Sequence, residues 1–182
     1  MKNIYSTGAA AVMMAAMLIM LFIPSSCVSE KDDDTPLWSL ATGDKVPGFH
    51  VTLDDGSLFS LYDIEHSICL IFFFDIDCSD CRTALPELQR TAQRLVEKGM
   101  ADVRVICISR GGDPGAIAEF WTRNSLTLPF SAQPDDRVYR LFANRIVPRY
   151  YVTLPGNPPV IGAYTTILWP ASDAVRTISG LR

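Results

Sequence analysis

The sequence predicts a layered α/β domain. The apolar run Leu70-Ile71-Phe72-Phe73-Phe74 is typical of a buried strand. The segment after it has apolar residues at helical spacing, which would share one face of a helix: Leu85, Leu88, Ala92, Leu95 and Val96. Strand-like and helix-like patterns then alternate up to residue 164, and this alternation indicates helices packed against a sheet.

The expected elements follow in order along the chain. A β-hairpin is expected first, with strands at 50–53 and 58–61 joined by a turn containing Asp55-Gly56. The central strand at 68–74 leads into a helix at 79–98, which ends at Gly99, a C-cap position. The remaining predictions are a strand at 103–108, a helix at 116–123, a short helix at 135–144, and strands at 150–154 and 160–164. The chain stops soon after Trp169-Pro170, so a C-terminal helix is expected to be short or missing.

Length and composition fit one globular domain plus a targeting segment. The chain has 182 residues, and its hydrophobic content of 48% argues against disorder over most of its length. The formal net charge of −4 argues against a nucleic-acid-binding surface. Five cysteines make an odd count, so at least one of them is expected to have a separate role.

Residues 1–27 have the pattern of a signal peptide. Lys2 is followed by an apolar stretch at 8–23, which is short for a membrane span and typical of a signal-peptide core. Pro24-Ser25-Ser26-Cys27 comes next, and this order resembles a bacterial lipoprotein signal. The resemblance implies that Cys27 becomes the lipidated first residue of the mature protein and anchors it to a membrane. An ordinary cleaved signal and an uncleaved anchor are the alternatives.

Residues 28–42 are expected to form an acidic tether, followed by one globular domain at 43–182. The segment from Ser29 to Asp34 is polar and cannot bury apolar surface. Similar acidic clusters act as surface-export signals in some lipoproteins of two-membrane bacteria. We nevertheless expect a position in the cell envelope on the periplasmic side rather than on the cell surface.

Cys78-Ser79-Asp80-Cys81 is the motif that carries the chemistry. The pair lies at the junction between the central strand and the helix, an arrangement suited to dithiol chemistry. The unpaired N–H groups and the positive dipole end of the helix stabilise a thiolate at Cys78. A thiolate is the species that attacks a disulfide, and Cys81 lies about one turn along and can close the ring.

The order of these parts resembles the thioredoxin-like superfamily, specifically the TlpA/ResA-like envelope thiol–disulfide oxidoreductases, in a lipoprotein form. The resemblance covers residues 43–164 and begins with Gly43-Asp44-Lys45-Val46-Pro47-Gly48-Phe49. Cys78 and Cys81 match the active-site pair, Pro86 matches a helix-kinking proline, and Val147-Pro148 matches a cis-proline that packs beside the dithiol. The resemblance implies a thioredoxin-like fold with a central mixed β-sheet flanked by helices.

Several positions depart from the family pattern. Asp77 stands where a tryptophan is usual, and Ser79-Asp80 replaces the common pair between the cysteines. Phe72 and Ala84 stand where relatives carry acidic residues, and Arg149 follows the proline where threonine is common. We expect Asp77, Asp80, Val147 and Arg149 to line the substrate groove or to tune the dithiol. Acids near Cys78 would disfavour its thiolate and favour the role of a reductant or isomerase.

Other types of site fit the sequence less well. A structural Cys78–Cys81 disulfide in a non-catalytic binding or scaffold lipoprotein is the main alternative. A zinc site would need two more ligands, and Cys69 and Cys107 are expected to be buried apolar residues of strands. A peroxiredoxin would need Thr or Ser three residues before the nucleophile, where this chain has Asp75. A copper chaperone would need a later histidine, and none follows His66.

The sequence therefore predicts a thiol–disulfide oxidoreductase of the bacterial cell envelope. Cys78 would attack a protein disulfide, Cys81 would resolve the mixed disulfide, and Pro148 would shape the groove. No metal or organic cofactor is expected. The expected partners are a protein dithiol or disulfide substrate, an upstream dithiol electron donor, and the membrane through the lipid anchor.

Overall fold

The computed structural model describes residues 36–182. The predicted signal peptide, the lipidation site Cys27 and the acidic run of the tether lie outside the described residues. The compact unit begins at Pro36, earlier than the expected boundary at 43. The reason is local pairing: the Leu40 N–H donates to the Phe142 carbonyl at 2.8 Å, and Ser39 forms a β-bridge with Ala143.

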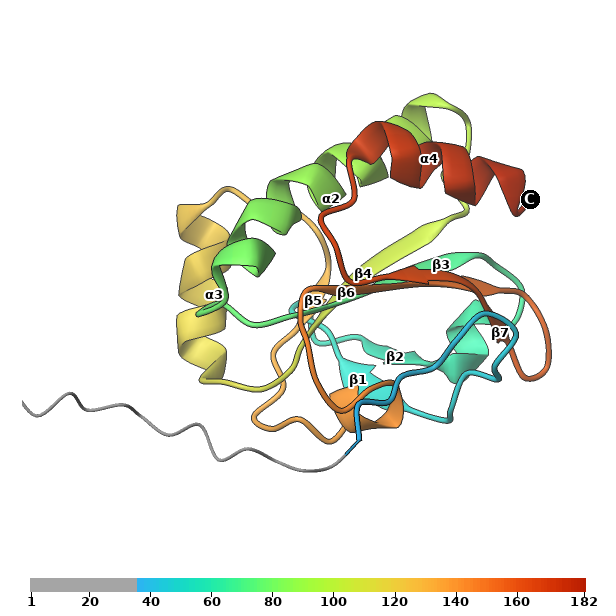
Figure 1. Cartoon of the computed structure of the whole chain (residues 1–182). Coiled ribbons are helices and arrows are strands. Elements are labelled where there is room, and N and C mark those ends of the chain that lie inside the picture. Colours follow the sequence, from blue (N-terminus) through green and yellow to red (C-terminus); the bar gives the residue numbers. More distant parts are fainter. Residues whose placement is uncertain (1–35) are drawn as a thin grey trace, which may run out of the picture. The chain divides into compact units, whose positions relative to one another are not determined.

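A mixed five-stranded sheet forms the centre of the domain (Figure 1). Its strand order is β5-β4-β3-β6-β7. The parallel strands are β3 (Cys69–Phe74), β4 (Arg104–Ser109) and β5 (Phe130–Ser131). The antiparallel strands are β6 (Arg149–Leu154) and β7 (Val160–Thr165). Every side chain of β3 is buried, as expected for a strand covered on both faces.

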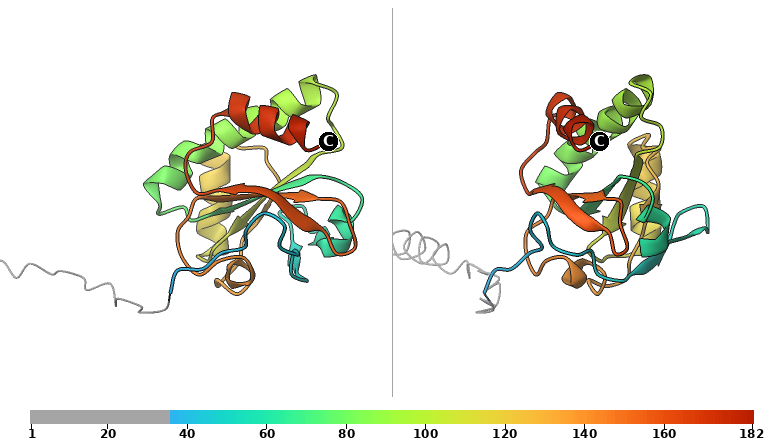
Figure 2. Two further views of the ribbon diagram at one scale, coloured as in Figure 1. Left: turned by 45° about the vertical axis from the view of Figure 1, so that its right-hand side comes forward. Right: turned by 90° about the vertical axis from the view of Figure 1, so that its right-hand side faces the viewer.

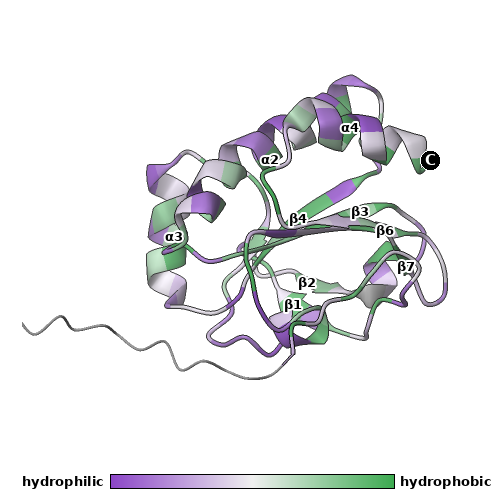
Figure 3. Cartoon of the chain, viewed as in Figure 1, coloured by the Kyte–Doolittle hydropathy of each residue, from purple (hydrophilic) through white to green (hydrophobic). Residues whose placement is uncertain are grey.

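Helices α2 (Ser79–Glu97) and α4 (Ala171–Gly180) pack together over one face of this sheet, as Figures 1 and 2 show. Helix α3 (Pro114–Arg123) packs near β5, where the Trp121 ring lies 4.5 Å from that of Phe130. Pro86 lies inside α2, as predicted. Figure 3 shows the hydrophobic residues concentrated in β3 and the hydrophilic ones over the outer surface of the helices.

The opposite face of the sheet is covered by the predicted hairpin and two short 3-10 helices. The hairpin pairs β1 (His50–Thr52) with β2 (Leu58–Ser60) as a separate two-stranded sheet, and Gly56 adopts the positive φ of its turn. The 3-10 helices are η2 (Leu61–Ile64) and η3 (Tyr139–Leu141). Phe73 of β3 packs here against the rings of Tyr139, Phe142 and Tyr151.

One sequence prediction about a helix is wrong, and the expectation of a C-terminal helix that is short or missing is resolved as a helix of 10 residues. The expected short helix at 135–144 is reduced to η3, because the Phe142 carbonyl and Ala143 pair with the segment at 39–40 instead of continuing a helix. The C-terminal helix is present as α4. Its buried residues Ala171, Ala174, Val175 and Ile178 recur at helical spacing, and that pattern was available in the sequence.

Within residues 36–182, no helix has both the length and the apolar character needed to cross a bilayer.

Candidate active site

Cys78 is the N-cap residue of α2, directly after the loop that leaves β3. Its backbone is extended, with φ −79° and ψ 118°, and its sulfur accepts a hydrogen bond from the Cys81 N–H at 3.4 Å. A sulfur at this position faces the unpaired amides and the positive dipole end of the helix, both of which favour a thiolate. Cys78 is partly exposed, so a substrate can reach it.

Cys81 lies one turn further along α2 and is fully buried. Burial raises the pKa of its thiol well above the usual value, and the charges of Cys78 and Asp75 act in the same direction. Both thiols are free in this structure. The pair is therefore asymmetric, with a reachable sulfur at Cys78 and a protonated, enclosed one at Cys81.

The loop before β6 lies beside Cys78, opposite the N-terminus of α2. The Val147–Pro148 peptide is cis, and the Cys78 thiol donates to the Val147 carbonyl at 3.5 Å. Pro148 is buried. The expected juxtaposition of the dithiol with a cis-proline is thus present, and the residues come from segments 69 positions apart in the sequence.

Arg149, expected to line the substrate groove or to tune the dithiol, is turned away from solvent. It is only 2% exposed, and its guanidinium donates to the Arg145 carbonyl at 2.8 Å and to the Ile146 carbonyl at 3.4 Å. The Tyr139 hydroxyl lies 2.5 Å and 2.9 Å from the same two oxygens. Arg149 therefore stabilises the loop that carries the cis-proline. This loop also contains Ile146, which has a positive φ of 72°.

The acidic residues near the dithiol differ in their exposure to solvent. Asp77 and Asp80 are exposed, and their expected effect on Cys78 stays a prediction. Asp75 is less exposed: its carboxylate accepts from the Asp77 N–H at 2.9 Å and pairs with Arg110 at 3.4 Å. Because its charge contributes to the raised pKa of Cys81, Asp75 belongs with the tuning residues. Its place three residues before Cys78 was the sequence signal for it.

A cavity of about 570 Å³ opens beside this loop. Its lining combines the loop after β3 with the loops before α3 and η3: Asp75, Ile76, Asp77, Arg110, Gly111, Gly112, Asp113, Ala116, Asp135 and Asp136. The Asp113 carboxylate accepts from the Ala116 N–H at 2.7 Å and so caps α3. The glycine-rich segment at 111–112 is thus a loop that borders this cavity.

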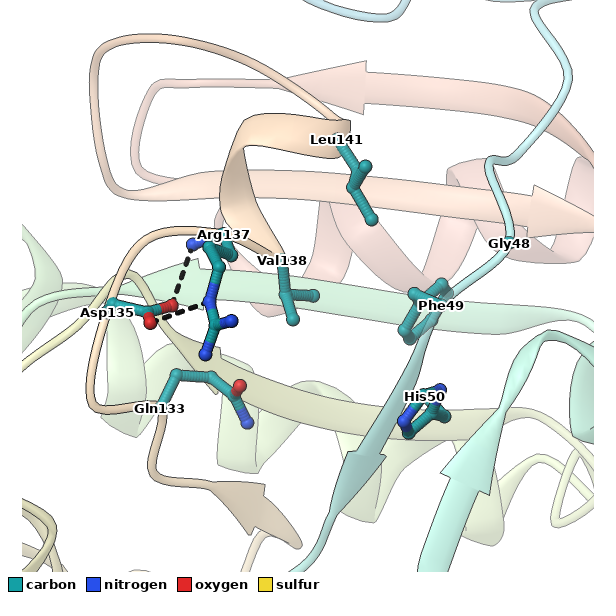
Figure 4. Close-up of a pocket in the computed structure, with 8 residues that line it drawn as sticks. All are labelled: Gly48, Phe49, His50, Gln133, Asp135, Arg137, Val138 and Leu141. Atoms are coloured by element: carbon teal, nitrogen blue, oxygen red, sulfur yellow. Dashed lines mark hydrogen bonds and ion pairs between the residues drawn. The ribbon is translucent and has the colours of Figure 1, made fainter.

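A second cavity, of about 420 Å³, lies between β1 and the segment at 133–141 (Figure 4). Figure 4 shows the Asp135 carboxylate bonded to Arg137 at one side of it and His50 at the other. Cys78, Cys81 and Pro148 are absent from its lining, so it does not belong to the dithiol site.

The other two described cysteines are buried in strands, as predicted. Cys69 and Cys107 are both fully buried, and burial raises the pKa of each thiol. Cys69 faces the hairpin side of the sheet and Cys107 faces the α2 side. Within residues 36–182, no three His, Cys, Asp or Glu side chains gather as the ligands of one metal ion would.

A mixed sheet with a Cys-x-x-Cys pair at a helix N-terminus beside a cis-proline defines the thioredoxin-like class, and the chain has this fold, as expected. The family model of the AhpC/TSA family matches residues 42–157, which include the dithiol and Pro148. The chain belongs to the AhpC/TSA family. No curated protein sequence matches it.

Solved structures support the fold. A candidate protein disulfide isomerase from Bacteroides thetaiotaomicron superposes with a TM-score of 0.68 at 20% identity, over 78% of this chain and 90% of that one. The thioredoxin domain of a thiol-disulfide oxidoreductase from Bacteroides vulgatus superposes with a TM-score of 0.64 at 20% identity, over 79% of this chain and 100% of that one. A secreted thiol-disulfide isomerase from Corynebacterium glutamicum superposes with a TM-score of 0.62 at 17% identity, over 81% of this chain and 95% of that one.

Proposed function

We propose that this chain is a thiol–disulfide oxidoreductase of the bacterial cell envelope that acts on protein partners as a reductant or isomerase. The observation that carries the proposal is the geometry of Cys78. Its sulfur lies at the N-terminus of α2, 3.4 Å from the Cys81 nitrogen and 3.5 Å from the Val147 oxygen. One reachable sulfur with an enclosed sulfur behind it is what a two-step exchange needs.

In this mechanism the Cys78 thiolate attacks a substrate disulfide, and the first substrate sulfur leaves as a thiol. Cys81 then attacks the Cys78 sulfur of the mixed disulfide, closes the Cys78–Cys81 disulfide and releases the second substrate sulfur. Two electrons pass from the enzyme dithiol to the substrate, so an upstream dithiol donor must reduce the enzyme again. Pro148 has no N–H and shapes the backbone beside Cys78.

The direction of exchange is inferred from the charges near the pair. Asp75, Asp77 and Asp80 are all close to Cys78 in sequence, and acids at this end of α2 oppose a thiolate. A less stabilised thiolate makes the disulfide a weaker oxidant, which favours the role of a reductant or isomerase over that of an oxidase.

Insulin reduction in the presence of dithiothreitol tests the activity. The full-length chain should accelerate precipitation of the insulin B chain, and Cys78→Ala should remove the acceleration because no other described thiol is reachable. Cys69→Val is the matched control, since it removes a buried thiol on the other face of the sheet and should keep the rate. An inactive wild-type chain would instead support a scaffold with a structural disulfide.

We propose further that Cys27 carries a lipid anchor that holds the domain on the periplasmic side of the envelope. The apolar stretch at 8–23 followed by Ser25-Ser26-Cys27 supports this anchor. The secreted relative from Corynebacterium glutamicum supports a site of action outside the cytoplasm.

Metabolic labelling with a palmitate analogue tests the anchor. The full-length chain should incorporate label and partition with membranes, whereas Cys27→Ser should lose both properties because the acceptor thiol is gone. Cys107→Ser, which also removes one thiol, should keep them. Label that persists in Cys27→Ser would contradict the lipoprotein assignment.

A further inference from the structure

Arg149 is a buried cation that binds backbone oxygens. It is only 2% exposed, and in the part of the chain that the structure describes its guanidinium donates to the Arg145 and Ile146 carbonyls rather than to a carboxylate. Burying a charged group costs folding free energy unless its hydrogen bonds compensate, and buried cations are usually paired with an anion. The reason for this cation therefore lies in the backbone segment that it holds.

The Tyr139 hydroxyl binds the same two oxygens. It lies 2.5 Å from the Arg145 oxygen and 2.9 Å from the Ile146 oxygen. Burial raises the pKa of this phenol, so it keeps its proton near neutral pH and remains a donor. Both donors are anchored to the central strand. Arg149 lies opposite Phe73 of β3 in the sheet, and the Tyr139 ring meets the Phe73 ring edge-on at 5.4 Å.

The segment held by this clamp, which consists of the Arg149 guanidinium and the Tyr139 hydroxyl, has an unfavourable backbone conformation. Ile146 has a φ of 72°, a region that β-branched residues rarely adopt because of steric clashes with the backbone. Such a conformation persists only where the surrounding structure fixes it. The Arg145 and Ile146 carbonyls belong to the two peptide groups on either side of Ile146, so the clamp fixes both of them.

The next carbonyl along the chain faces the nucleophile. The Cys78 thiol donates to the Val147 oxygen at 3.5 Å. Because peptide groups are planar, fixing the two peptides on either side of Ile146 leaves few orientations for the Val147 carbonyl that follows. A carbonyl oxygen in this place accepts a hydrogen bond from the neutral thiol and repels a thiolate, so it favours the protonated form of Cys78.

We propose that Arg149 and Tyr139 are positioning residues of the exchange reaction, which aim the Val147 carbonyl at the Cys78 thiol and restrain its conversion to the reactive thiolate. The inference rests on the proposed function and gives its redox direction a second source, besides the acidic residues near the pair. Arg149 thus acts on the dithiol indirectly, through the loop before β6, and neither residue of the clamp gives up a proton.

Alkylation by iodoacetamide measures how readily Cys78 forms its thiolate, because the thiolate is the species that reacts. The full-length chain carries Cys27→Ser so that position 27 is not modified, and Cys69, Cys81 and Cys107 are fully buried. The rate at which one adduct appears is followed by intact mass from about pH 5 to about pH 9, on both sides of neutral pH. Cys78→Ser, which should gain no adduct, assigns the reaction to Cys78.

Tyr139→Phe and Arg149→Lys weaken the clamp without changing the net charge. Phenylalanine lacks the hydroxyl, and lysine keeps the charge but lacks the planar fork of nitrogen donors. In each variant alkylation at neutral pH should be roughly threefold faster, as expected for the loss of one weak hydrogen bond to the neutral thiol. The pH profile of the rate should move about half a unit lower.

Two matched variants change the same residue types outside the clamp. Arg140→Lys alters an exposed arginine of η3 that pairs with Asp136, and Tyr164→Phe removes an exposed phenol of β7. Both should be alkylated at the wild-type rate. The charged and titratable groups that border Cys78 along the chain or in the adjoining loop are the same in all these variants: Asp75, Asp77, Asp80, Cys81, Arg82 and Arg110.

A wild-type rate and pH profile in Tyr139→Phe or in Arg149→Lys would overturn the role of that residue. Slower alkylation would mean that the loop promotes the thiolate, and a faster rate with an unmoved pH profile would show easier access instead of easier ionisation; either result contradicts the inference. The same acceleration in Arg140→Lys or Tyr164→Phe would show a general loosening of the fold. If Arg149→Lys does not fold, Tyr139→Phe decides alone, because phenylalanine fills the same ring space.

Insulin reduction tests the proposed function separately from the clamp. A wild-type chain that is inactive on insulin would contradict the proposed function, whatever the alkylation rates of the variants. A wild-type chain that is active on insulin, with variants that are alkylated as wild type is, would contradict the role of Arg149 and Tyr139 alone.

Discussion

Cys81→Ser should convert Cys78 into a trap for substrate disulfides. In wild type, Cys81 is held one turn from Cys78 on a rigid helix, so resolution is an intramolecular step with a high effective concentration of thiol. Serine cannot form the second disulfide. The mixed disulfide must then wait for an outside thiol, and its lifetime should increase by at least about a hundredfold.

The adduct should be seen by intact mass after incubation of the reduced chain with a disulfide substrate and removal of excess thiol. Cys78→Ser should give no adduct, because Cys81 is buried and burial keeps its thiol protonated. Cys107→Ser should behave as wild type, because Cys107 is also fully buried. An adduct on Cys81 in the Cys78→Ser chain would mean that the roles of the two sulfurs are reversed.

The sequence predicted most of the fold because its strong patterns are local. The apolar run at 70–74, the helical spacing after it and the Asp55-Gly56 turn each identify an element from neighbouring residues alone. The two-residue strand β5 has no such pattern, and it exists because Cys107 and Ile108 of β4 pair with it. The wrong short helix at 135–144 failed for a similar reason, since residues at 39–40 compete for its backbone groups.

The parts of the candidate site that match sequence motifs were predictable. Cys78, Cys81 and Val147-Pro148 were found by spacing and resemblance, and the structure brings them together. The contacts of Arg149 were not predictable, because no sequence pattern shows that its guanidinium pairs with the Arg145 and Ile146 carbonyls.

The stability of the protein should fall steeply in alkali, because the fold buries several weak acids in their protonated form. Burial raises the pKa of Cys69, Cys107 and Cys81, raises the pKa of Tyr151 to about 12, and also raises those of Tyr139 and Tyr150. In the unfolded chain the thiols ionise near their ordinary value of 9.0 and the phenols near 10.0. Above about pH 9 the unfolded state therefore binds fewer protons than the folded state, and the free energy of unfolding decreases as pH rises.

Each group that is ionised only in the unfolded state lowers the free energy of unfolding by about 1.4 kcal/mol per pH unit. The three fully buried thiols, Cys69, Cys81 and Cys107, should together contribute a slope of about 4 kcal/mol per pH unit once the unfolded thiols are ionised. The tyrosines should steepen the fall above about pH 10. Below about pH 8 these groups are protonated in both states, so their stabilising contribution is fully present there and is lost only as pH rises.

Urea unfolding of the full-length chain, with a phosphine reductant and at pH values from about 7 to 11, measures this slope. The matched variant is Cys69→Val with Cys107→Val, which keeps apolar side chains of similar size in the same strands but removes both buried thiols. Between about pH 9 and 10 its free energy of unfolding should decline about one third as steeply as that of wild type, because only Cys81 of the three buried thiols remains, and it should fall faster once the tyrosines begin to ionise in the unfolded chain. Equal slopes in the two proteins over that interval would show that the buried thiols are not the cause of the decline. If the free energy of unfolding of wild type does not change up to about pH 11, the thiols and phenols must titrate alike in the folded and unfolded states. Such behaviour requires a core that is far more open to water than this one.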